Sequence, residues 1–368
     1  MRIYTRWIWS ILRAMLLVML VFASLSDSVY PLRQARAQEV FCSQPHQDVS
    51  TPLNDLGAQV YIRRDGQNTG FTGGLYPNGS NLRPAAHEAA GVAIARQITP
   101  LSAEGAPDPL NGKIVLISIG MSNTSQEFLT FIRAAENEPL INPKVLLVNG
   151  ASAGQVAEYW TSPDAPNWQA VKDRLAHEGV TPLQVQAAWV KLTRTGSGDF
   201  PAKAQLLQSD LKAVVRNLKF HFPNIKLTYL SSRTRSYLTG EGLSPEPAAF
   251  ETGFAVKWLI EDQINGDPEL NYDPGNGTVV APFLSWGPYI WADGMNPRSD
   301  GLIWRQEDLA RDCVHPSSNG KQKVAVMLMD FFLHDSTTRW FLANPIDIFY
   351  LYLPWLSHYL PEFPMLIR

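Results

Sequence analysis

Residues that commonly bind metals or cofactors are scarce in this chain. Its 368 residues include two cysteines, Cys42 and Cys313, and seven scattered histidines. No Cys-x-x-Cys and no His-x-x-x-His spacing occurs, so the ligand patterns of the common zinc sites are missing. We therefore expect neither a bound metal nor a cofactor.

Charged residues are also few, at 18% of the chain, and the net charge is −3. Removal of residues 1–37 would leave 26 Lys and Arg against 33 Asp and Glu, a net charge of −7. An excess of negative charge disfavours contact with the phosphates of nucleic acid and with anionic membrane surfaces. We therefore expect no nucleic-acid partner.

The apolar stretch at residues 14–23 is too short to cross a membrane comfortably. Arginines precede it and a small-x-small site ends at Ala37, a layout typical of a secretory signal peptide. An uncleaved N-terminal anchor is the alternative interpretation of residues 1–37. The protein is thus expected to be secreted or extracytoplasmic, or membrane-anchored if that segment is retained. Residues 343–368 form an apolar, aromatic tail, and either terminal segment is a candidate for peripheral membrane contact.

Apolar runs and helical periodicities alternate from residue 113 onward. The pattern predicts strands at residues 113–119, 144–148, 185–190, 225–230 and 278–283. It predicts helices at residues 85–98, 126–137, 168–178, 203–221, 248–264 and 317–333. This alternation is typical of an α/β fold, a three-layer α/β/α sandwich with a doubly wound parallel sheet. Residues 113–342 are expected to form the sandwich, and residues 38–112 a loop-rich lead-in packed on it.

Three residues that together can activate a hydroxyl group lie near the predicted strand ends and the last helix. Ser122 follows the first strand, and Asp312 and His315 are spaced i, i+3 before the last helix. A serine hydroxyl is a poor nucleophile until an imidazole takes its proton, and a carboxylate fixes the imidazole tautomer. Because sites in such folds lie outside the carboxyl ends of the strands, we expect the three side chains to converge.

Three segments around these residues carry a family resemblance. Residues 117–123 (ISIGMSN), 149–154 (NGASAG) and 312–320 (DCVHPSSNG) resemble, in the same order, the first, second and last sequence blocks of the SGNH or GDSL-like hydrolases. The resemblance spans most of the predicted sandwich, and the Gly-x-Ser-Asn form is closer to the carbohydrate-esterase branch of the family. Members are mostly esterases, lipases, thioesterases and carbohydrate deacetylases with a flavodoxin-like fold.

The resemblance implies a role for each matching residue. Ser122 would be the nucleophile, His315 the general base and Asp312 the residue that orients the base. The backbone N–H groups of Ser122 and Gly154 would face the oxyanion of the reaction intermediate. Gly154 can also be a turn glycine that needs a positive φ.

One block departs from the family pattern. Where the family places Gly-x-Asn-Asp after the third strand, residues 188–193 read AWVKLT and contain no asparagine. That asparagine normally donates a hydrogen bond to the oxyanion, and loss of one such donor typically costs about 10²–10³ in rate. Either Lys191 replaces it as a cationic donor, or the site is weaker than the family norm, or the matching block lies elsewhere.

Asn123, Trp286 and Trp291 are assigned to substrate binding. Aromatic side chains can wall a sugar or acyl site, although the tryptophans can equally belong to simple packing. Arg233 and Arg235 follow the fourth strand and are interpreted as solvated or ion-paired residues rather than substrate clamps.

We expect a disulfide between Cys42 and Cys313. An even cysteine count in an oxidising compartment favours pairing, and the start of a mature chain needs an anchor. Two unpaired thiols, with Cys313 as a small buried apolar residue, are the alternative.

These features together predict an exported, metal-independent serine hydrolase. It would cleave a small-molecule or carbohydrate ester of a carboxylic acid through an acyl-enzyme, with carbohydrate O-deacetylation as the preferred class. One alternative is a binding or scaffold protein that keeps the fold but has weak or no turnover, because of the missing asparagine. Another is a lipase-like esterase of the cell envelope.

Overall fold

The structure is a computed structural model that describes residues 39–240 and 242–343. The expected signal peptide or anchor at residues 1–37 lies outside the described residues. So does all but Ala343 of the apolar tail at 343–368, and with these segments the expected membrane contacts. Within the described ranges, no helix combines the length and the apolar character needed to span a bilayer.

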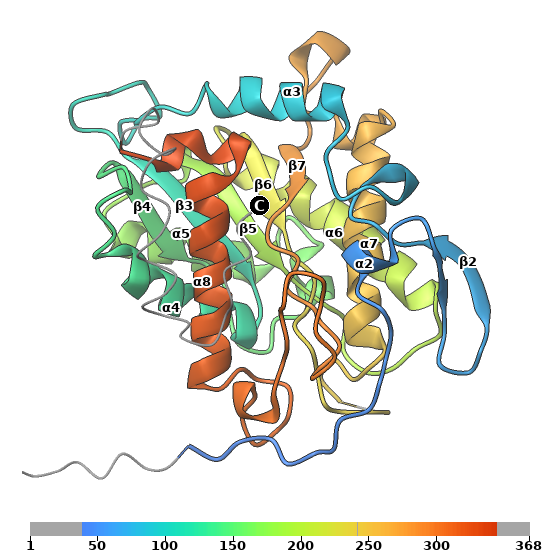
Figure 1. Ribbon diagram of the computed structural model, residues 1–368. Coiled ribbons are helices and arrows are strands. Elements are labelled where there is room, and N and C mark those ends of the chain that lie inside the picture. The colour runs from blue at the N-terminus through green and yellow to red at the C-terminus, as the bar shows by residue number, and fades with distance from the viewer. Residues whose placement is uncertain (1–38, 241, 344–368) are drawn as a thin grey trace, which may run out of the picture. The chain divides into compact units, whose positions relative to one another are not determined.

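A five-stranded parallel sheet forms the centre of the fold (Figure 1). Its strands are β3 (Ile114–Gly120), β4 (Val145–Asn149), β5 (Val185–Lys191), β6 (Leu227–Leu230) and β7 (Phe283–Trp286). They are hydrogen-bonded in the order β4-β3-β5-β6-β7, and every pair of neighbours is parallel. The predicted doubly wound parallel sheet is therefore confirmed.

Two sets of helices cover the two faces of this sheet, which completes the three-layer α/β/α sandwich (Figure 1). One face carries α3 (Ala85–Ala95), α4 (Ser122–Ala135) and α8 (Ser318–His334). The opposite face carries α5 (Pro166–His177), α6 (Ala202–His221) and α7 (Ala248–Ile264).

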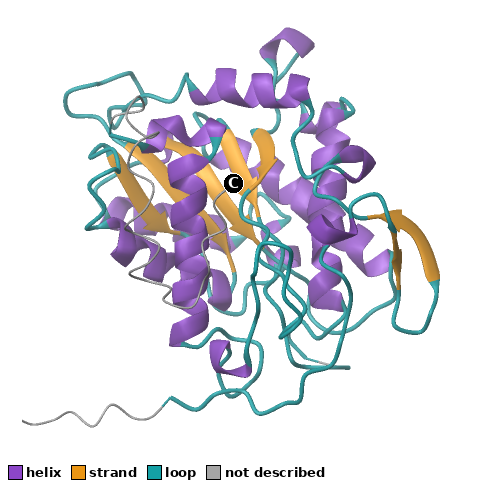
Figure 2. Cartoon of the chain, viewed as in Figure 1, coloured by secondary structure: helices purple, strands orange, loops and turns teal. Residues whose placement is uncertain are grey.

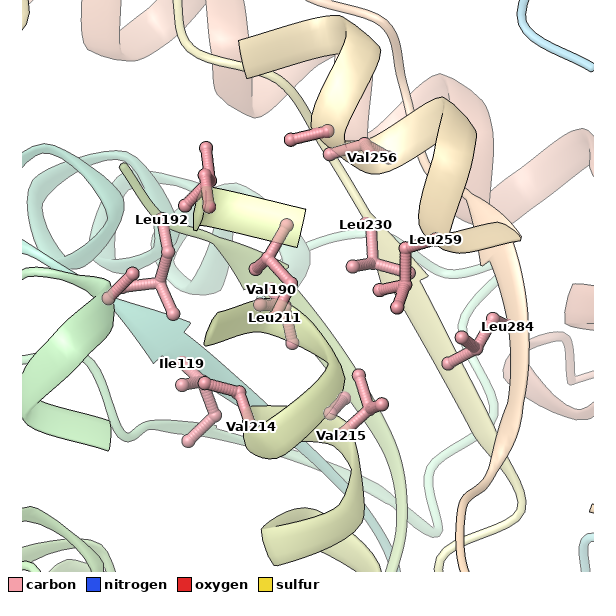
Figure 3. Packing of buried hydrophobic residues seen from close by; sticks show 14 of the residues in the cluster. Ile119, Val190, Leu192, Leu211, Val214, Val215, Leu230, Val256, Leu259 and Leu284 are labelled. Atoms are coloured by element: carbon pink, nitrogen blue, oxygen red, sulfur yellow. The ribbon is translucent and has the colours of Figure 1, made fainter. Parts of the chain in front are cut away.

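Alternate residues of the strands pack into two separate cores. In β3 every residue is buried: Leu116 joins the core under α3, α4 and α8, whereas Ile117 and Ile119 join the core under α5, α6 and α7. A strand that is apolar on both sides must be covered on both faces, which is why a continuous apolar run predicts a central parallel strand. Figure 3 shows the second core, where Val190, Leu230 and other strand residues pack against α6 and α7.

The predicted elements of the sandwich match the observed ones within about four residues at each end, except for the last strand. That strand was expected at 278–283 but lies at Phe283–Trp286, so its predicted position is wrong. The N–H groups of Val280 and Ala281 donate to Asn271 O and hold this apolar stretch in a loop instead. Only after Pro282 does the chain pair with β6.

The lead-in contains short elements that its glycine-rich sequence did not predict. A short helix precedes an antiparallel hairpin, in the order α2 (Leu53–Leu56), β1 (Val60–Ile62) and β2 (Asn68–Thr72). Short 3-10 helices occupy several connections of the described chain: η1 (Pro77–Gly79), η2 (Ala157–Trp160), η3 (Pro182–Gln184), η4 (Pro268–Leu270), η5 (Pro274–Asn276), η6 (Gln306–Asp308) and η7 (Ser336–Phe341).

The winding of the sheet reverses at β3. The chain leaves β3 for β4 on one side and returns to β5 on the other. Such a reversal opens a crevice outside the carboxyl ends of the strands, which is where ligands bind in folds of this class. Figure 2 shows long loops gathered at one end of the sheet, among them the segment that leads from β7 to α8.

A buried carboxyl group in the core beneath α7 makes a testable contribution to stability. Glu251 is 3% exposed, and the hydroxyl of Tyr61 donates to its Oε1 at 3.2 Å. Burial raises the pKa of Glu251 to about 7, against the opposing effect of the Tyr61 hydrogen bond. Since the unfolded carboxyl titrates near 4.5, the folded state holds its proton more tightly between pH 4.5 and about 7. Stability should therefore fall as pH rises through this window.

We predict that Glu251→Gln removes this pH dependence. The amide oxygen still accepts from Tyr61, but the group carries no titrating proton. The free energy of unfolding of the variant, relative to that of wild type, should therefore rise by up to roughly 3 kcal/mol from pH 5 to pH 8. Urea unfolding at the two pH values measures the difference. If the free energy of unfolding changes equally with pH in the two proteins, Glu251 is not the group responsible.

Candidate active site

Ser122 stands where β3 passes directly into α4. It is the first residue of the helix, and only Met121 separates it from the strand. The turn requires Gly120, because a Cβ there would lie 2.3 Å from Thr124 Oγ1 and 2.6 Å from Lys191 O. The first N–H groups of a helix have no partner inside the helix, and the helix dipole favours negative charge at this end. Ser122 is thus half-buried at a position suited to an anionic intermediate.

Hydrogen bonds join Ser122, His315 and Asp312 in the order that activation of a nucleophile requires. The Oγ atom of Ser122 lies 2.7 Å from His315 Nε2, and His315 Nδ1 lies 2.5 Å from Asp312 Oδ2. When Nδ1–H donates to the carboxylate, Nε2 keeps a lone pair that can accept the serine proton. The structure therefore brings the three predicted residues together.

The Asp312 carboxylate is organised by its own loop. Its Oδ1 accepts from the backbone N–H groups of Val314 at 3.1 Å and His315 at 2.9 Å, while Oδ2 faces the imidazole. Burial alone would raise the pKa of Asp312, but the hydrogen bonds from the His315 backbone and side chain and from Val314 outweigh it. The pKa of Asp312 is held below its usual range, so the group remains a carboxylate at neutral pH.

Asn123 connects the nucleophile helix to this loop. Its Nδ2 donates to Val314 O at 2.8 Å, and its side chain is fully buried. The expectation that Asn123 binds substrate is therefore wrong, because its amide is turned inward. Its observed role is to fix the residue that precedes His315 against the helix that carries Ser122.

The predicted disulfide between Cys42 and Cys313 is present and ties down the same loop. Cys313 has a positive φ of 62°, and its carbonyl accepts from Tyr237 N at 3.1 Å. On the other side, Cys42 N donates to Leu309 O at 3.1 Å. The loop with Asp312 and His315 is thus held by a covalent bond and by backbone hydrogen bonds to two distant segments.

Gly154 lies in the turn that follows β4. Ser152 N donates to Gly120 O at 3.0 Å and fastens this turn to the end of β3. Gly154 has a positive φ of 73° and is exposed, and within the described chain its N–H has no hydrogen-bond acceptor. Its turn geometry is established, and its part in binding an oxyanion stays a prediction.

Lys191 is engaged elsewhere, which overturns its expected role as an oxyanion donor. Its Nζ lies 2.6 and 2.5 Å from the two carboxylate oxygens of Glu127, and both side chains are 0% exposed. Burial lowers the pKa of Lys191 to about 8, although the neighbouring Glu127 acts in the opposite direction. An ammonium bound in this way is not free to donate to a group at the surface.

The two tryptophans that were expected to bind substrate belong to the core. Trp286 is 3% exposed and donates from Nε1 to Leu75 O at 2.6 Å, whereas Trp291 is fully buried and donates to Glu246 Oε1 at 2.9 Å. Both lie in the core under α6 and α7. The packing alternative is correct for both residues, and their assignment to substrate binding is wrong.

Arg233 and Arg235 were expected to be solvated or ion-paired; both are buried, so neither is solvated. Arg235 is ion-paired: its Nη1 lies 2.8 Å from Asp293 Oδ1 and its Nη2 donates to Gln47 O at 2.5 Å. Arg233 is 1% exposed, and its Nε and Nη1 atoms find no acceptor among the described residues. Burial lowers the pKa of Arg233, while Glu127 and Glu246 act in the opposite direction.

Glu127 is a residue of this region that sequence reasoning missed. It falls in a predicted amphipathic helix, where a glutamate is usually a surface residue. A signal was nevertheless available: Lys191 directly follows the apolar strand predicted at 185–190, and an ammonium buried there needs a buried partner. Glu127, five residues after Ser122 in a predicted helix, was a candidate for that partner.

The arrangement can carry out nucleophilic catalysis at a carbonyl group. It holds a hydroxyl, a base within hydrogen-bond distance of it and a carboxylate that orients the base. Within residues 39–240 and 242–343, no group of three or more His, Cys, Asp and Glu side chains is placed to hold a metal ion.

Comparisons with known proteins find only weak similarities. No family model and no curated protein matches the sequence. The chain is similar to the solved structure of a family two carbohydrate esterase from Clostridium thermocellum, in complex with cellohexaose, at 15% identity and a TM-score of 0.34. That match covers 61% of this chain and 64%, less than two thirds, of the esterase chain.

A second similar structure is the periplasmic domain of the lipopolysaccharide acetyltransferase of Salmonella ser. Paratyphi A. The identity is 11% and the TM-score 0.33, over 68% of this chain and 96% of that one. TM-scores this low mean that neither structure bears on what this chain does.

Reduction of the disulfide should lower both the melting temperature and the rate at which Ser122 reacts, because the bond anchors the loop of Asp312 and His315. The two cysteines are 271 residues apart, for which chain entropy gives an upper limit of about 5 to 6 kcal/mol. Differential scanning fluorimetry with and without dithiothreitol measures the shift.

The Cys42→Ser, Cys313→Ser double variant is the control and should not respond to the reductant. Thiol titration of the denatured, unreduced protein provides a direct check. Two free thiols per chain in protein kept under oxidising conditions would rule the bond out.

Proposed function

We propose that the protein is an exported serine hydrolase that cleaves carboxylic esters through an acyl-enzyme. The observation that carries the proposal is the continuous hydrogen-bonded path from Ser122 Oγ through His315 to Asp312. Carbohydrate O-acetyl esters are the proposed substrate class, because the Gly-x-Ser-Asn form around Ser122 resembles the carbohydrate-esterase branch of the SGNH hydrolases. The disulfide fits export, since such bonds persist mainly in oxidising compartments.

In the proposed reaction, His315 Nε2 takes the proton of Ser122 as Oγ attacks the ester carbonyl. The resulting imidazolium is stabilised by the Asp312 carboxylate at Nδ1. It then gives its proton to the departing alcohol, which leaves an acyl group on Ser122. In the second half, His315 activates a water molecule, which attacks the acyl carbonyl and releases the carboxylic acid and the free serine.

The negative charge that develops on the carbonyl oxygen needs hydrogen-bond donors. Ser122 offers its N–H at the start of α4, and Gly154 offers an N–H on an exposed turn tied to the end of β3. Since Lys191 is bound to Glu127, it adds no third donor. Loss of one donor typically lowers the rate about 10²–10³-fold, so we expect slower turnover than in a hydrolase with three donors.

The engagement of Lys191 also supports a second candidate function. A protein with the sandwich and the hydrogen-bonded path, but with too few oxyanion donors, would bind an ester or a carbohydrate without turning it over. The two functions differ in one measurable property, because only the hydrolase forms a covalent bond at Ser122.

We predict that a fluorophosphonate probe labels wild-type protein at Ser122 and fails to label Ser122→Ala. Ser122 contributes little packing at its half-buried position, so the melting temperature should stay nearly unchanged. Ser125→Ala is the matched control: this serine lies on the same helix, but its Oγ accepts a hydrogen bond from Asn149, and among the described residues no hydrogen bond joins it to His315. It should retain labelling.

Hydrolysis of short p-nitrophenyl esters and of acetylated sugars then defines the substrate class. An unlabelled wild-type protein that still binds acetylated sugars would favour the binding protein. Wild-type esterase activity in Ser122→Ala would overturn the proposed nucleophile.

A further inference from the structure

Arg233 is a buried cation, and its Nε and Nη1 atoms have no hydrogen-bond acceptor among the described residues. Arg233 follows β6, in a segment that continues to Tyr237, whose N–H donates to Cys313 O. Burial lowers the pKa of Arg233, and the charge of Glu127 on α4 acts in the opposite direction. The register of β3, β5 and β6 places Arg233 at the same carboxyl edge of the sheet as Ser122, two strands across from Gly120.

Burying the Arg233 guanidinium without acceptors for Nε and Nη1 in the described ranges costs folding free energy. An arginine remains charged in proteins, and a buried charge without a partner destabilises the folded state. Its Nε and Nη1 atoms have no acceptor in the described part of the chain. Packing does not explain the residue, because an apolar side chain of similar size would avoid this cost.

The two nearby carboxylates are both engaged with other groups. Glu127 has both of its oxygens on Lys191 Nζ, at 2.6 and 2.5 Å. Glu246 accepts from the N–H groups of Ser236 and Phe250 and from the indole of Trp291. The charge of Arg233 is consequently not cancelled by direct contact with either acid.

The backbone of Lys191 also lies beside the start of the helix that carries Ser122. Lys191 pairs with Gly120 in the register of β5 and β3, and its carbonyl accepts from Thr124 Oγ1 at 2.7 Å. Glu127 is five residues after Ser122 on α4. If Lys191 lost its charge, Glu127 would be free to neutralise Arg233 at this position.

We propose that the positive charge of Arg233 stabilises the oxyanion at Ser122 through its electric field. Lys191 preserves this field, because its ion pair with Glu127 keeps that carboxylate from neutralising Arg233. The inference rests on the proposed ester hydrolysis, and it assigns to Arg233 part of the stabilisation that a side-chain donor would otherwise give. Arg233 does not touch the substrate. At an effective dielectric constant of about 20, a unit charge roughly 10 Å from a reacting anion changes the rate on the order of tenfold.

The test is a series of charge variants, measured by kcat and KM for p-nitrophenyl acetate and by the rate of fluorophosphonate labelling of Ser122. Arg233→Met and Lys191→Met should each lower kcat and the labelling rate roughly tenfold with KM unchanged, since the field acts mainly on the transition state. Arg233→Lys should stay close to wild type. The double variant Lys191→Met, Glu127→Gln should recover most of the loss, because it removes the acid that would cancel Arg233.

The recovery separates the electrostatic role from a structural one. A structural role predicts that the double variant, which lacks the whole ion pair, is at least as impaired as Lys191→Met. Lys257→Met is the matched control: Lys257 is a buried lysine of α7 whose Nζ donates to Thr72 O and Gly73 O, and its loss should leave kcat unchanged. Comparing Lys191→Met with the double variant keeps the test decisive if Arg233→Met does not fold.

Two results would overturn the proposal. One is a double variant no faster than Lys191→Met, and the other is an Arg233→Met protein that reacts like wild type. An unreactive wild-type protein would instead remove the proposed function itself, and this inference with it. Wild-type labelling together with equal rates across the series would remove the inference alone.

Discussion

The close approach of β3 and β5 at Gly120 is the constraint on which the site depends. A side chain at Gly120 would collide with Lys191 O and with Thr124 Oγ1, which are hydrogen-bonded to each other at 2.7 Å. Because this contact is so tight, α4 starts immediately beside the end of β5. The start of the helix sets the position of Ser122, and the same helix places Asn123 against Val314 and Glu127 against Lys191. One glycine therefore allows three functional contacts to coexist.

The sequence predicted those features that depend on local pattern or on a short motif. Continuous apolar runs indicated central strands, and the i, i+3 spacing of Asp312 and His315 indicated a carboxylate that reaches back to its own imidazole. It failed where a residue's role depends on which side of an element it faces. Asn123, Trp286 and Trp291 have the chemistry of binding residues, but their polar groups are used inside the protein. Lys191 failed for a similar reason, since its partner Glu127 comes from another element.

Buried polar groups are the feature that organises the surroundings of the site. Lys191, Glu127, Arg233 and Arg235 are all nearly or fully buried within one region at the carboxyl ends of β5 and β6. Each hydrogen-bonded member fixes the relative position of two elements, as Lys191 does for β5 and α4. Such groups are costly to bury and must be satisfied together, so this region tolerates less change than the apolar cores on either side.

The disulfide has a consequence for when the candidate site is assembled. The bond joins residues 271 positions apart, and Ser122 is 193 residues from its hydrogen-bond partner His315. During synthesis the nucleophile helix emerges long before the loop of Asp312 and His315, and contacts between such distant segments form late because of the entropy of closing long loops. A partly made chain therefore contains the serine without its base. Under the proposed function, Ser122 becomes reactive only after the loop of Asp312 and His315 has docked.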